Sequence, residues 1–128
     1  MTDPRRRVLV ADDSALLRQW CRHALEPAGF EIEEALNGIE ALEKALVSSF
    51  DLIIVDVNMP YMDGITFLQS LRRQPLPLGG TPTLVASTEG GPQDREAARQ
   101  AGANFYLVKP LDEDVLRRHV AALTGAAA

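Results

Sequence analysis

The sequence predicts an α/β domain built on a doubly wound, parallel sheet of five strands. Strand-like and helix-like patterns alternate five times along the 128 residues, which predicts repeated βα units. Residues 52–55 are continuously apolar, which is typical of a central strand buried on both faces. Short loops join the successive patterns, and right-handed connections of this kind place helices on both faces of the sheet.

The first strand and the first helix are predicted from the N-terminal third of the chain. A strand pattern covers about residues 7–11, and Ser14 then offers an N-cap to a helix that Pro27 and Gly29 end. Three apolar pairs at helical spacing predict the buried face of this helix: Leu16/Leu17, Trp20/Cys21 and Ala24/Leu25.

The second strand, near residues 30–35, is predicted to lie at an edge of the sheet. Its residues Glu31, Glu33 and Glu34 carry charge, which protects an exposed edge from pairing with other chains. Gly38 opens a second helix. The predicted apolar face of this helix consists of Ile39, Leu42 and Leu46.

The second half of the chain continues the alternation. A third helix starts at Gly64, residues 74–82 form a loop rich in Pro and Gly, and residues 83–86 form the fourth strand. The fourth helix, near residues 92–101, has only alanines for an apolar face, so we expect it to be weakly held. A fifth strand and a last helix capped by Asp112 complete a flavodoxin-like (βα)5 fold, for which we choose the strand order 2-1-3-4-5.

Length and composition limit the class of protein. With 46% hydrophobic residues, the chain is expected to form one globular domain rather than a disordered segment. The net charge of −5 and the pI near 5.0 argue against nucleic acid as a partner. Cys21 is the only cysteine, which excludes an internal disulfide and favours a cytoplasmic location. No apolar stretch approaches the length of a membrane span, so membrane insertion is not expected.

Four charged residues stand at the predicted carboxyl ends of strands. Asp12 and Asp13 follow the first strand, Asp56 the third and Lys109 the fifth. Because parallel strands end at one edge of the sheet, these side chains are expected to share one pocket. Two carboxylates about 5 Å apart repel by roughly 3 kcal/mol at an effective dielectric of about 20, so a cation is expected among them. Oxygen ligands beside solvent favour Mg²⁺, and the lack of a Cys/His cluster argues against zinc.

A lysine beside a metal site indicates that a second anion enters the pocket. A phosphoryl group transferred to a carboxylate is such an anion, since its oxygens need a metal and cationic or hydrogen-bonding donors around them. Asp56 is the best nucleophile because it ends the most central strand, and its attack on phosphorus would give an acyl phosphate. Ser87, at the end of the fourth strand, can supply a hydroxyl donor.

The same motifs carry a resemblance that covers nearly the whole chain. They are Val8-Leu9-Val10-Ala11-Asp12-Asp13-Ser14, Asp51-Leu52-Ile53-Ile54-Val55-Asp56-Val57-Asn58-Met59-Pro60-Tyr61-Met62-Asp63-Gly64, Ala101-Gly102-Ala103 and Lys109-Pro110. Together they resemble the receiver domain of a two-component response regulator, in a stand-alone form like the chemotaxis regulators. One such regulator is a standard example of the order 2-1-3-4-5, so that choice rests partly on the resemblance. We expect a single receiver domain over residues 1–128, with a core of about residues 6–124 and no output domain.

The resemblance implies a role for each residue of the pocket. Asp56 would accept the phosphoryl group from the phosphohistidine of a histidine kinase. Asp13, Asp56 and the backbone carbonyl of Asn58 would coordinate Mg²⁺, with Asp12 acting partly through water. Lys109 would pair with the phosphoryl oxygens.

The resemblance also assigns two switch residues. Ser87 would be the switch hydroxyl, and Tyr106 would be the switch aromatic that turns inward on phosphorylation. Thr88 stays open as an alternative hydroxyl, although the spacing to Lys109 favours Ser87. The peptide bond between Lys109 and Pro110 is expected to be cis.

The partners implied are a histidine kinase, a target protein that docks on the fourth helix, fifth strand and fifth helix, and a phosphatase. The flagellar motor of a chemotaxis pathway is the leading target, and a role as phosphorelay shuttle or phosphate sink is the alternative. No turnover of an external substrate is expected, since only Asp56 itself would gain and lose a phosphoryl group. A haloacid-dehalogenase-like phosphatase is more remote, because the second aspartate of that family is replaced here by Asn58, which cannot transfer protons.

Overall fold

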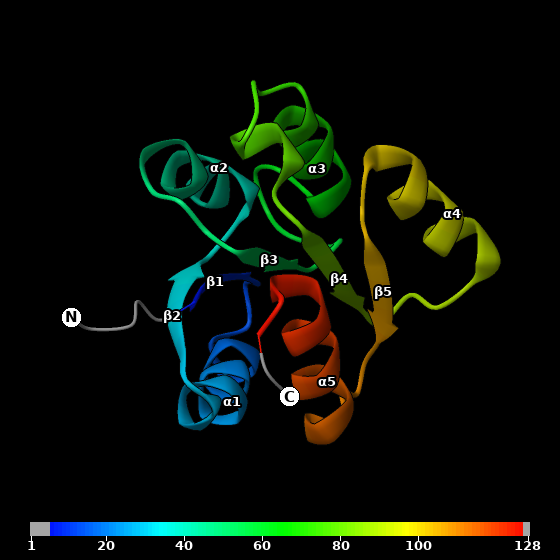
Figure 1. The fold of residues 1–128 in the computed structure, drawn as a ribbon. Helices are drawn as coiled ribbons and strands as arrows, with labels where there is room; N and C mark the ends of the chain where they lie inside the picture. The colour runs from blue at the N-terminus through cyan, green and yellow to red at the C-terminus, as the bar shows by residue number, and fades with distance from the viewer. Residues whose placement is uncertain (1–5, 127–128) are drawn as a thin grey trace.

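The computed structural model describes residues 6–126, in which five parallel strands alternate with five α-helices (Figure 1). The strands are β1 (Arg6–Ala11), β2 (Phe30–Ala35), β3 (Leu52–Val55), β4 (Thr83–Ser87) and β5 (Phe105–Val108). The helices are α1 (Ala15–Leu25), α2 (Gly38–Val47), α3 (Gly64–Arg72), α4 (Pro92–Ala101) and α5 (Glu113–Thr124). The sheet order is β2-β1-β3-β4-β5, so the predicted doubly wound, flavodoxin-like fold with order 2-1-3-4-5 is confirmed.

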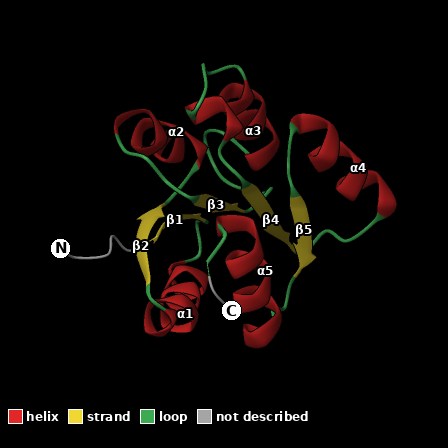
Figure 2. Cartoon of the chain, in the orientation of Figure 1, coloured by secondary structure: helices red, strands yellow, loops and turns green. Residues whose placement is uncertain are grey.

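Helices cover both faces of the sheet, with α2, α3 and α4 on one face and α1 and α5 on the other (Figure 2). The side chains of β3 alternate between the two layers. Ile53 and Val55 pack with the first set of helices, whereas Leu52 and Ile54 pack with the second. All four are at most 1% exposed, as the continuous apolar run of this strand predicts.

Side-chain caps determine where the helices begin at the carboxyl edge of the sheet. Ser14 and Asp112 accept hydrogen bonds from amides in the first turns of α1 and α5, as predicted. Asn37 and Asp63 cap α2 and α3 in the same way. These caps satisfy amide groups that have no partner within the helix. The first turns of these helices are therefore held in place next to the loops at this edge of the sheet.

The buried face of α1 differs from the predicted one. Leu16 is 77% exposed, so its placement on the apolar face is wrong, whereas Arg18 is only 8% exposed and lies on the buried face with Cys21 and Leu25. Arg18 can be buried because its guanidinium meets hydrogen-bond acceptors there.

The buried face of α2 consists of small residues. Ile39 and Leu46 are 44% and 52% exposed, so their placement on the apolar face is wrong. The amide of Gly38 donates to the carbonyl of Met62, and a Cβ at Gly38 would lie 2.3 Å from that oxygen. The buried residues of α2 are Gly38, Ala41 and Ala45, and Leu42 packs against the core while partly buried.

Helix α4 buries few of its side chains against the rest of the molecule. Of the ten residues of α4, only Ala98 and Ala101 are buried, which agrees with its alanine face. The segment 74–82 is a loop with one short 3₁₀ turn, Leu78–Gly80, and β4 runs on to Ser87.

Within residues 6–126, no helix is both long enough and apolar enough to cross a membrane.

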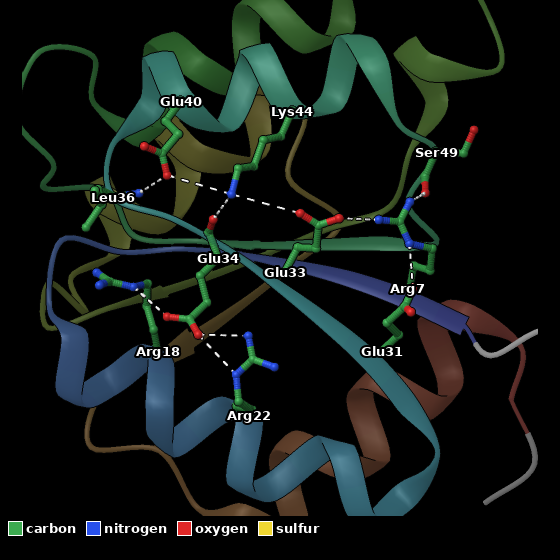
Figure 3. A network of polar contacts seen from close by, with 10 residues as sticks. All are labelled: Arg7, Arg18, Arg22, Glu31, Glu33, Glu34, Leu36, Glu40, Lys44 and Ser49. Carbon is green, nitrogen blue, oxygen red and sulfur yellow. Dashed lines mark hydrogen bonds and ion pairs between the residues drawn. The ribbon is translucent and has the colours of Figure 1, made fainter.

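The edge strand β2 carries paired charges (Figure 3). Glu31 and Glu33 both pair with Arg7 of β1, and Glu34 pairs with Arg18 and Arg22 of α1. The glutamates predicted to mark an edge therefore lie at the edge, and each of them has a cationic partner.

Candidate functional site

Three carboxylates meet where β1 and β3 end. Asp12 and Asp13 follow β1, and Asp56 follows β3. The three residues lie close together because the parallel register places Ala11, the last residue of β1, beside Val55, the last residue of β3. One carboxylate oxygen from each of the three lies within 4.8 Å of the others. Asp12 and Asp56 are buried, at 2% and 8% exposed, whereas Asp13 is exposed. The predicted acid cluster is therefore formed.

Asp12 is held at each of its polar atoms. Its amide donates to the carbonyl of Ala35, and its own carbonyl accepts from Arg18 at 2.6 Å. Its Oδ1 accepts from the amide of Ser14 at 2.9 Å, and its Oδ2 accepts from Lys109 Nζ at 2.7 Å. Contacts from β2, from α1 with its N-cap, and from the end of β5 thus hold Asp12 in position.

Lys109 supplies positive charge to the cluster. Its Nζ lies 2.7 Å from Asp12 Oδ2 and 3.4 Å from Asp56 Oδ2, and its side chain is 16% exposed. This ammonium group offsets part of the negative charge of the carboxylates, and the open side of the cluster still leaves the expected metal ion a place. The Lys109–Pro110 bond is cis, as expected.

Burial and charge shift the pKa values of two groups in the cluster. The pKa of Asp56 is raised, mainly because burial disfavours its charged form; Lys109 opposes this shift and the charge of Asp12 adds to it. Burial alone would lower the pKa of Lys109, but its hydrogen bond to Asp12 and the charges of Asp12 and Asp56 outweigh burial and raise it. Lys109 therefore stays protonated near neutral pH.

The loop after β3 passes close to the cluster. Asn58 is exposed, and its amide donates to Asp56 Oδ1 at 3.4 Å. Gly64 has to be glycine here, since a Cβ would lie 2.2 Å from the carbonyl oxygen of Asp56. Tyr61 has a φ of 68°, an uncommon conformation for a residue with a side chain, and is 87% exposed.

Ser87 and Thr88 differ in their surroundings. Ser87 is fully buried at the end of β4, where its Oγ accepts a hydrogen bond from the amide of Glu89 at 3.1 Å. Thr88 is exposed. The backbone carbonyl of Ser87 also accepts from the amide of Lys109, which links the ends of β4 and β5.

Tyr106 already points inward. It is 9% exposed, its hydroxyl donates to the carbonyl of Glu89, and the guanidinium of Arg95 lies 5.3 Å from its ring centroid. The switch role assigned to Tyr106 on phosphorylation stays a prediction. The hydroxyl bond also ties β5 to the loop that follows Ser87.

Sequence reasoning missed Arg18 and Glu34. Arg18 contacts the carbonyl of Asp12, and Glu34 holds Arg18. The sequence pattern could have shown the burial of Arg18, because Arg18, Cys21 and Leu25 stand at positions i, i+3 and i+7 and so share one face of the helix.

The donor set fits a divalent cation that prefers oxygen ligands. Asp12, Asp13 and Asp56 offer carboxylate oxygens, and the exposure of Asp13 leaves one side of the cluster open to water. Mg²⁺ binds through a few carboxylates and keeps several waters, which this arrangement allows. The cluster could therefore hold such an ion.

Sequence comparison places the chain among known signalling domains. The model of the response regulator receiver domain family matches residues 8–121. The chain is 38% identical over 118 residues to the sensor protein EvgS of Escherichia coli K12, covering 91% of the chain and 9% of that protein. It is also 38% identical over 104 residues to the transcriptional regulatory protein PrrA of Mycobacterium leprae, covering 81% of the chain and 43% of that protein. The chain thus spans less than half the length of either relative.

Solved structures share the fold. The chemotaxis protein CheY4 of Vibrio cholerae has a TM-score of 0.87 and 39% identity, with 94% of this chain and 99% of that chain covered. The receiver domain of sensor histidine kinase PA1611 from Pseudomonas aeruginosa, solved with magnesium coordinated in its active site cleft, has a TM-score of 0.87 and 26% identity, with 96% and 100% covered. Such domains serve two-component signalling with histidine kinases and are not turnover enzymes. By family match, sequence identity and fold, this chain belongs to the response regulator receiver domain family.

Proposed function

We propose that this chain takes a phosphoryl group from a histidine kinase onto Asp56 and passes the signal on by a change of its surface. One observation carries the proposal. Asp56 lies in a cluster of three carboxylates and within 3.4 Å of the Lys109 ammonium, at the one edge of the sheet where β1, β3 and β5 all end. Acyl phosphate chemistry needs such a nucleophile with positive charge beside it.

Asp12, Asp13 and Asp56, with the backbone carbonyl of Asn58, would hold Mg²⁺. When bound, the ion supplies positive charge that neutralises the carboxylates and the incoming phosphoryl oxygens. Lys109 would remain beside them as the second cation. Asp12 is suited to an indirect contact through water, because both of its carboxylate oxygens already accept hydrogen bonds.

In the transfer, an oxygen of Asp56 attacks the phosphorus of the phosphohistidine. A P–O bond forms as the P–N bond breaks, and the electron pair of the broken bond stays on the imidazole nitrogen. Lys109, whose Nζ lies 3.4 Å from Asp56 Oδ2, would pair with a phosphoryl oxygen. Later attack by water on phosphorus returns the free carboxylate and inorganic phosphate, so no external substrate is turned over.

The switch would run through Ser87 and Tyr106. The phosphoryl group brings about −1.5 to −2 charge near pH 7, and its oxygens can accept hydrogen bonds. In this structure the Ser87 hydroxyl accepts a hydrogen bond from the amide of Glu89. If the hydroxyl donates to the phosphoryl oxygens, it moves relative to that amide. Since the carbonyl of Glu89 accepts from Tyr106, this movement would reach the surface formed by α4, β5 and α5, where a target docks. Thr88, which is exposed, is the less suited hydroxyl.

We further propose that residues 1–128 hold one receiver domain, with a core of about residues 6–124, and that it acts in the cytoplasm. The flagellar motor is the favoured target, because CheY4, a chemotaxis protein, is matched over 99% of its chain at 39% identity. A phosphorelay shuttle or phosphate sink is the second candidate, because a sensor protein is matched over 9% of its length at 38% identity. A phosphatase that shortens the signal is an additional partner.

The test of the phosphoryl acceptor uses acetyl phosphate as donor, with and without Mg²⁺. Intact-mass measurement should show one added phosphoryl group that requires Mg²⁺, and peptide mapping should place it on Asp56. Asp56→Asn should show none, whereas the control Asp51→Asn, at an exposed aspartate directly before β3 begins, should behave like the wild type. A phosphoryl group on another residue, or none in the wild type, would contradict the proposal.

The two downstream roles are separated by partner binding. The purified phosphorylated and unphosphorylated chains are each offered a flagellar switch protein and a histidine phosphotransfer domain. Tighter binding of the phosphorylated chain to the switch protein supports the chemotaxis role. Transfer of the phosphoryl group to the phosphotransfer domain, without binding to the switch protein, supports the shuttle.

A further inference from the structure

Arg18 is a buried cation directly beneath the acid cluster. Its side chain is 10% exposed, and its NH1 donates to the backbone carbonyl of Asp12 at 2.6 Å. Within the described part of the chain, its guanidinium forms no hydrogen bond or ion pair with the carboxylates of the cluster; it contacts the backbone of Asp12 instead. Arg18 can therefore act on the cluster through the position of Asp12.

Glu34 holds Arg18 in place from the neighbouring strand β2 (Figure 3). Its Oε1 accepts from Arg18 Nε at 2.8 Å, and its Oε2 accepts from Arg22 at 2.8 and 3.0 Å. The backbone carbonyl of Glu34 accepts from Lys44 of α2. Glu34 is thus itself held by helices on both faces of the sheet.

Both backbone polar groups of Asp12 therefore form hydrogen bonds to other segments. Its amide donates to Ala35, the residue after Glu34, at 3.1 Å, and its carbonyl accepts from Arg18, which Glu34 orients. Both contacts lead back to the same end of β2. A shift of that strand end or loss of Arg18 would let Asp12 and the adjoining Asp13 move relative to Asp56.

We propose that Arg18, anchored by Glu34, is a positioning residue that sets the spacing of the carboxylates for a divalent cation. This inference rests on the proposed function, which assigns the cation to Asp12, Asp13 and Asp56. Residues that orient metal ligands without touching the metal change metal affinity by about 10- to 100-fold when they are replaced.

Stability alone is a poor reason for this arrangement. A buried ion pair can often be replaced by apolar residues of similar size at no loss of stability, because burying two charges is costly. A methionine at position 18 could fill much of the same space among Cys21 and Leu25. What methionine lacks is the donor aimed at the carbonyl of Asp12.

The experiment is a titration with Mg²⁺ alone, without phosphodonor, followed by ¹H–¹⁵N NMR of the amides of Asp13, Ser14 and Asn58. Arg18→Met should bind Mg²⁺ about 10-fold or more weakly than the wild type while remaining folded. Arg18→Lys, which keeps one donor, should recover part of the affinity. Arg99→Met is the matched control, since Arg99 pairs with Glu96 on α4 and, among the described residues, forms no hydrogen bond or ion pair with the cluster. The affinity of this variant should equal that of the wild type.

Each outcome decides between the two proposals. If the wild type does not bind Mg²⁺, the cation site fails and the inference fails with it. If the wild type binds and Arg18→Met binds equally well, only the inference is overturned. Should Arg18→Met not fold, Glu34→Gln takes its place, because Glu34 is 29% exposed and the substitution removes the charge that pairs with Arg18. An unchanged affinity in folded Glu34→Gln then overturns the inference, and a weakened one supports it.

Discussion

The two ends of the sheet are held in different ways. At one end, α1 buries Arg18, Cys21 and Leu25 against β2 and β1, and Glu34 ties the helix to the edge strand. At the other end, α4 buries only two alanines, and the loop before it contains Gly90 and Gly91. The first region is secured by large apolar side chains and paired charges, whereas α4 contributes only small apolar side chains to the core.

The difference matches what each region would have to do. A carboxylate cluster that binds an ion and a phosphoryl group works only if its members keep their spacing, so the elements behind it need to be rigid. A surface that reports phosphorylation has to change shape, and regions with few buried apolar contacts open at low free-energy cost. A shift from mostly inactive to mostly active needs a differential of about 5.5 kcal/mol, which is easier to meet where little packing opposes it.

The largest expected effect tests the packing of the rigid end. Leu25→Ala removes a fully buried side chain from α1 and should lower the free energy of unfolding by about 2–5 kcal/mol. Urea unfolding followed by circular dichroism measures this change. Leu46→Ala is the control, because Leu46 is 52% exposed on α2 and its loss should change little. Equal losses in the two variants would remove the basis for calling the α1 end tightly packed.

A smaller effect, which depends on pH, concerns Glu34. Burial alone would raise the pKa of Glu34, but the hydrogen bonds and charges of Arg22 and Arg18 outweigh it and lower the pKa. A carboxylate whose pKa is lowered in the folded state adds stability above its unfolded pKa, near 4.3, and loses it as the pH falls through the folded pKa. Glu34→Gln should therefore cost about 1–2 kcal/mol at neutral pH.

Measuring the same two proteins at several pH values tests whether the charge of Glu34 causes the difference in stability. Unfolding free energies of the wild type and of Glu34→Gln, measured from neutral pH down into the acid range, should converge as the carboxylate of the wild type becomes protonated. A gap that stays the same at every pH would mean that the charge of Glu34 does not stabilise this end of the sheet.

The next effect is expected at the loosely held end. Tyr106→Phe removes the hydroxyl that donates to the carbonyl of Glu89 and should cost about 0.5–1.5 kcal/mol. Hydrogen exchange should become faster at the amides of residues 89–91, whereas the amides of α1 should exchange as in the wild type. Equal acceleration in both regions would show that the two ends do not open independently.

The smallest expected effect is at the surface of α4. Arg99 pairs with Glu96, but both side chains are about half exposed or more. Such exposed pairs contribute little, because solvent screens them and two flexible side chains must be ordered. Arg99→Met should leave the midpoint of urea unfolding unchanged. A clear loss of stability would mean that α4 is held more firmly than its alanine face indicates.

Much of the candidate site could be predicted from local sequence. Asp12, Asp56 and Lys109 each end an apolar strand, and one rule of parallel sheets brings the ends of strands together. The caps at Ser14 and Asp112 followed from residue type and position alone. These predictions succeeded because each depends on a short stretch of chain and on the direction in which a strand runs.

The faces of α1 and α2 could not be predicted in the same way. Spacing placed Leu16, Ile39 and Leu46 inside, but all three are exposed. Periodicity shows that a helix has an apolar side, whereas the neighbouring elements decide which residues they approach. The loop carrying Met62 comes so close to α2 that Gly38 faces it instead of a larger residue.

The sequence by itself determined the order of the elements, the chemical nature of the residues that end the strands, and hence the acid cluster. Only the tertiary structure decided that Arg18 lies beneath Asp12, that Glu34 orients it and that Tyr106 is already turned inward. The reason is physical. A strand end is a local property of the chain, but a buried charge can be stable only where partners from distant segments meet it, and those partners come together only in the folded molecule.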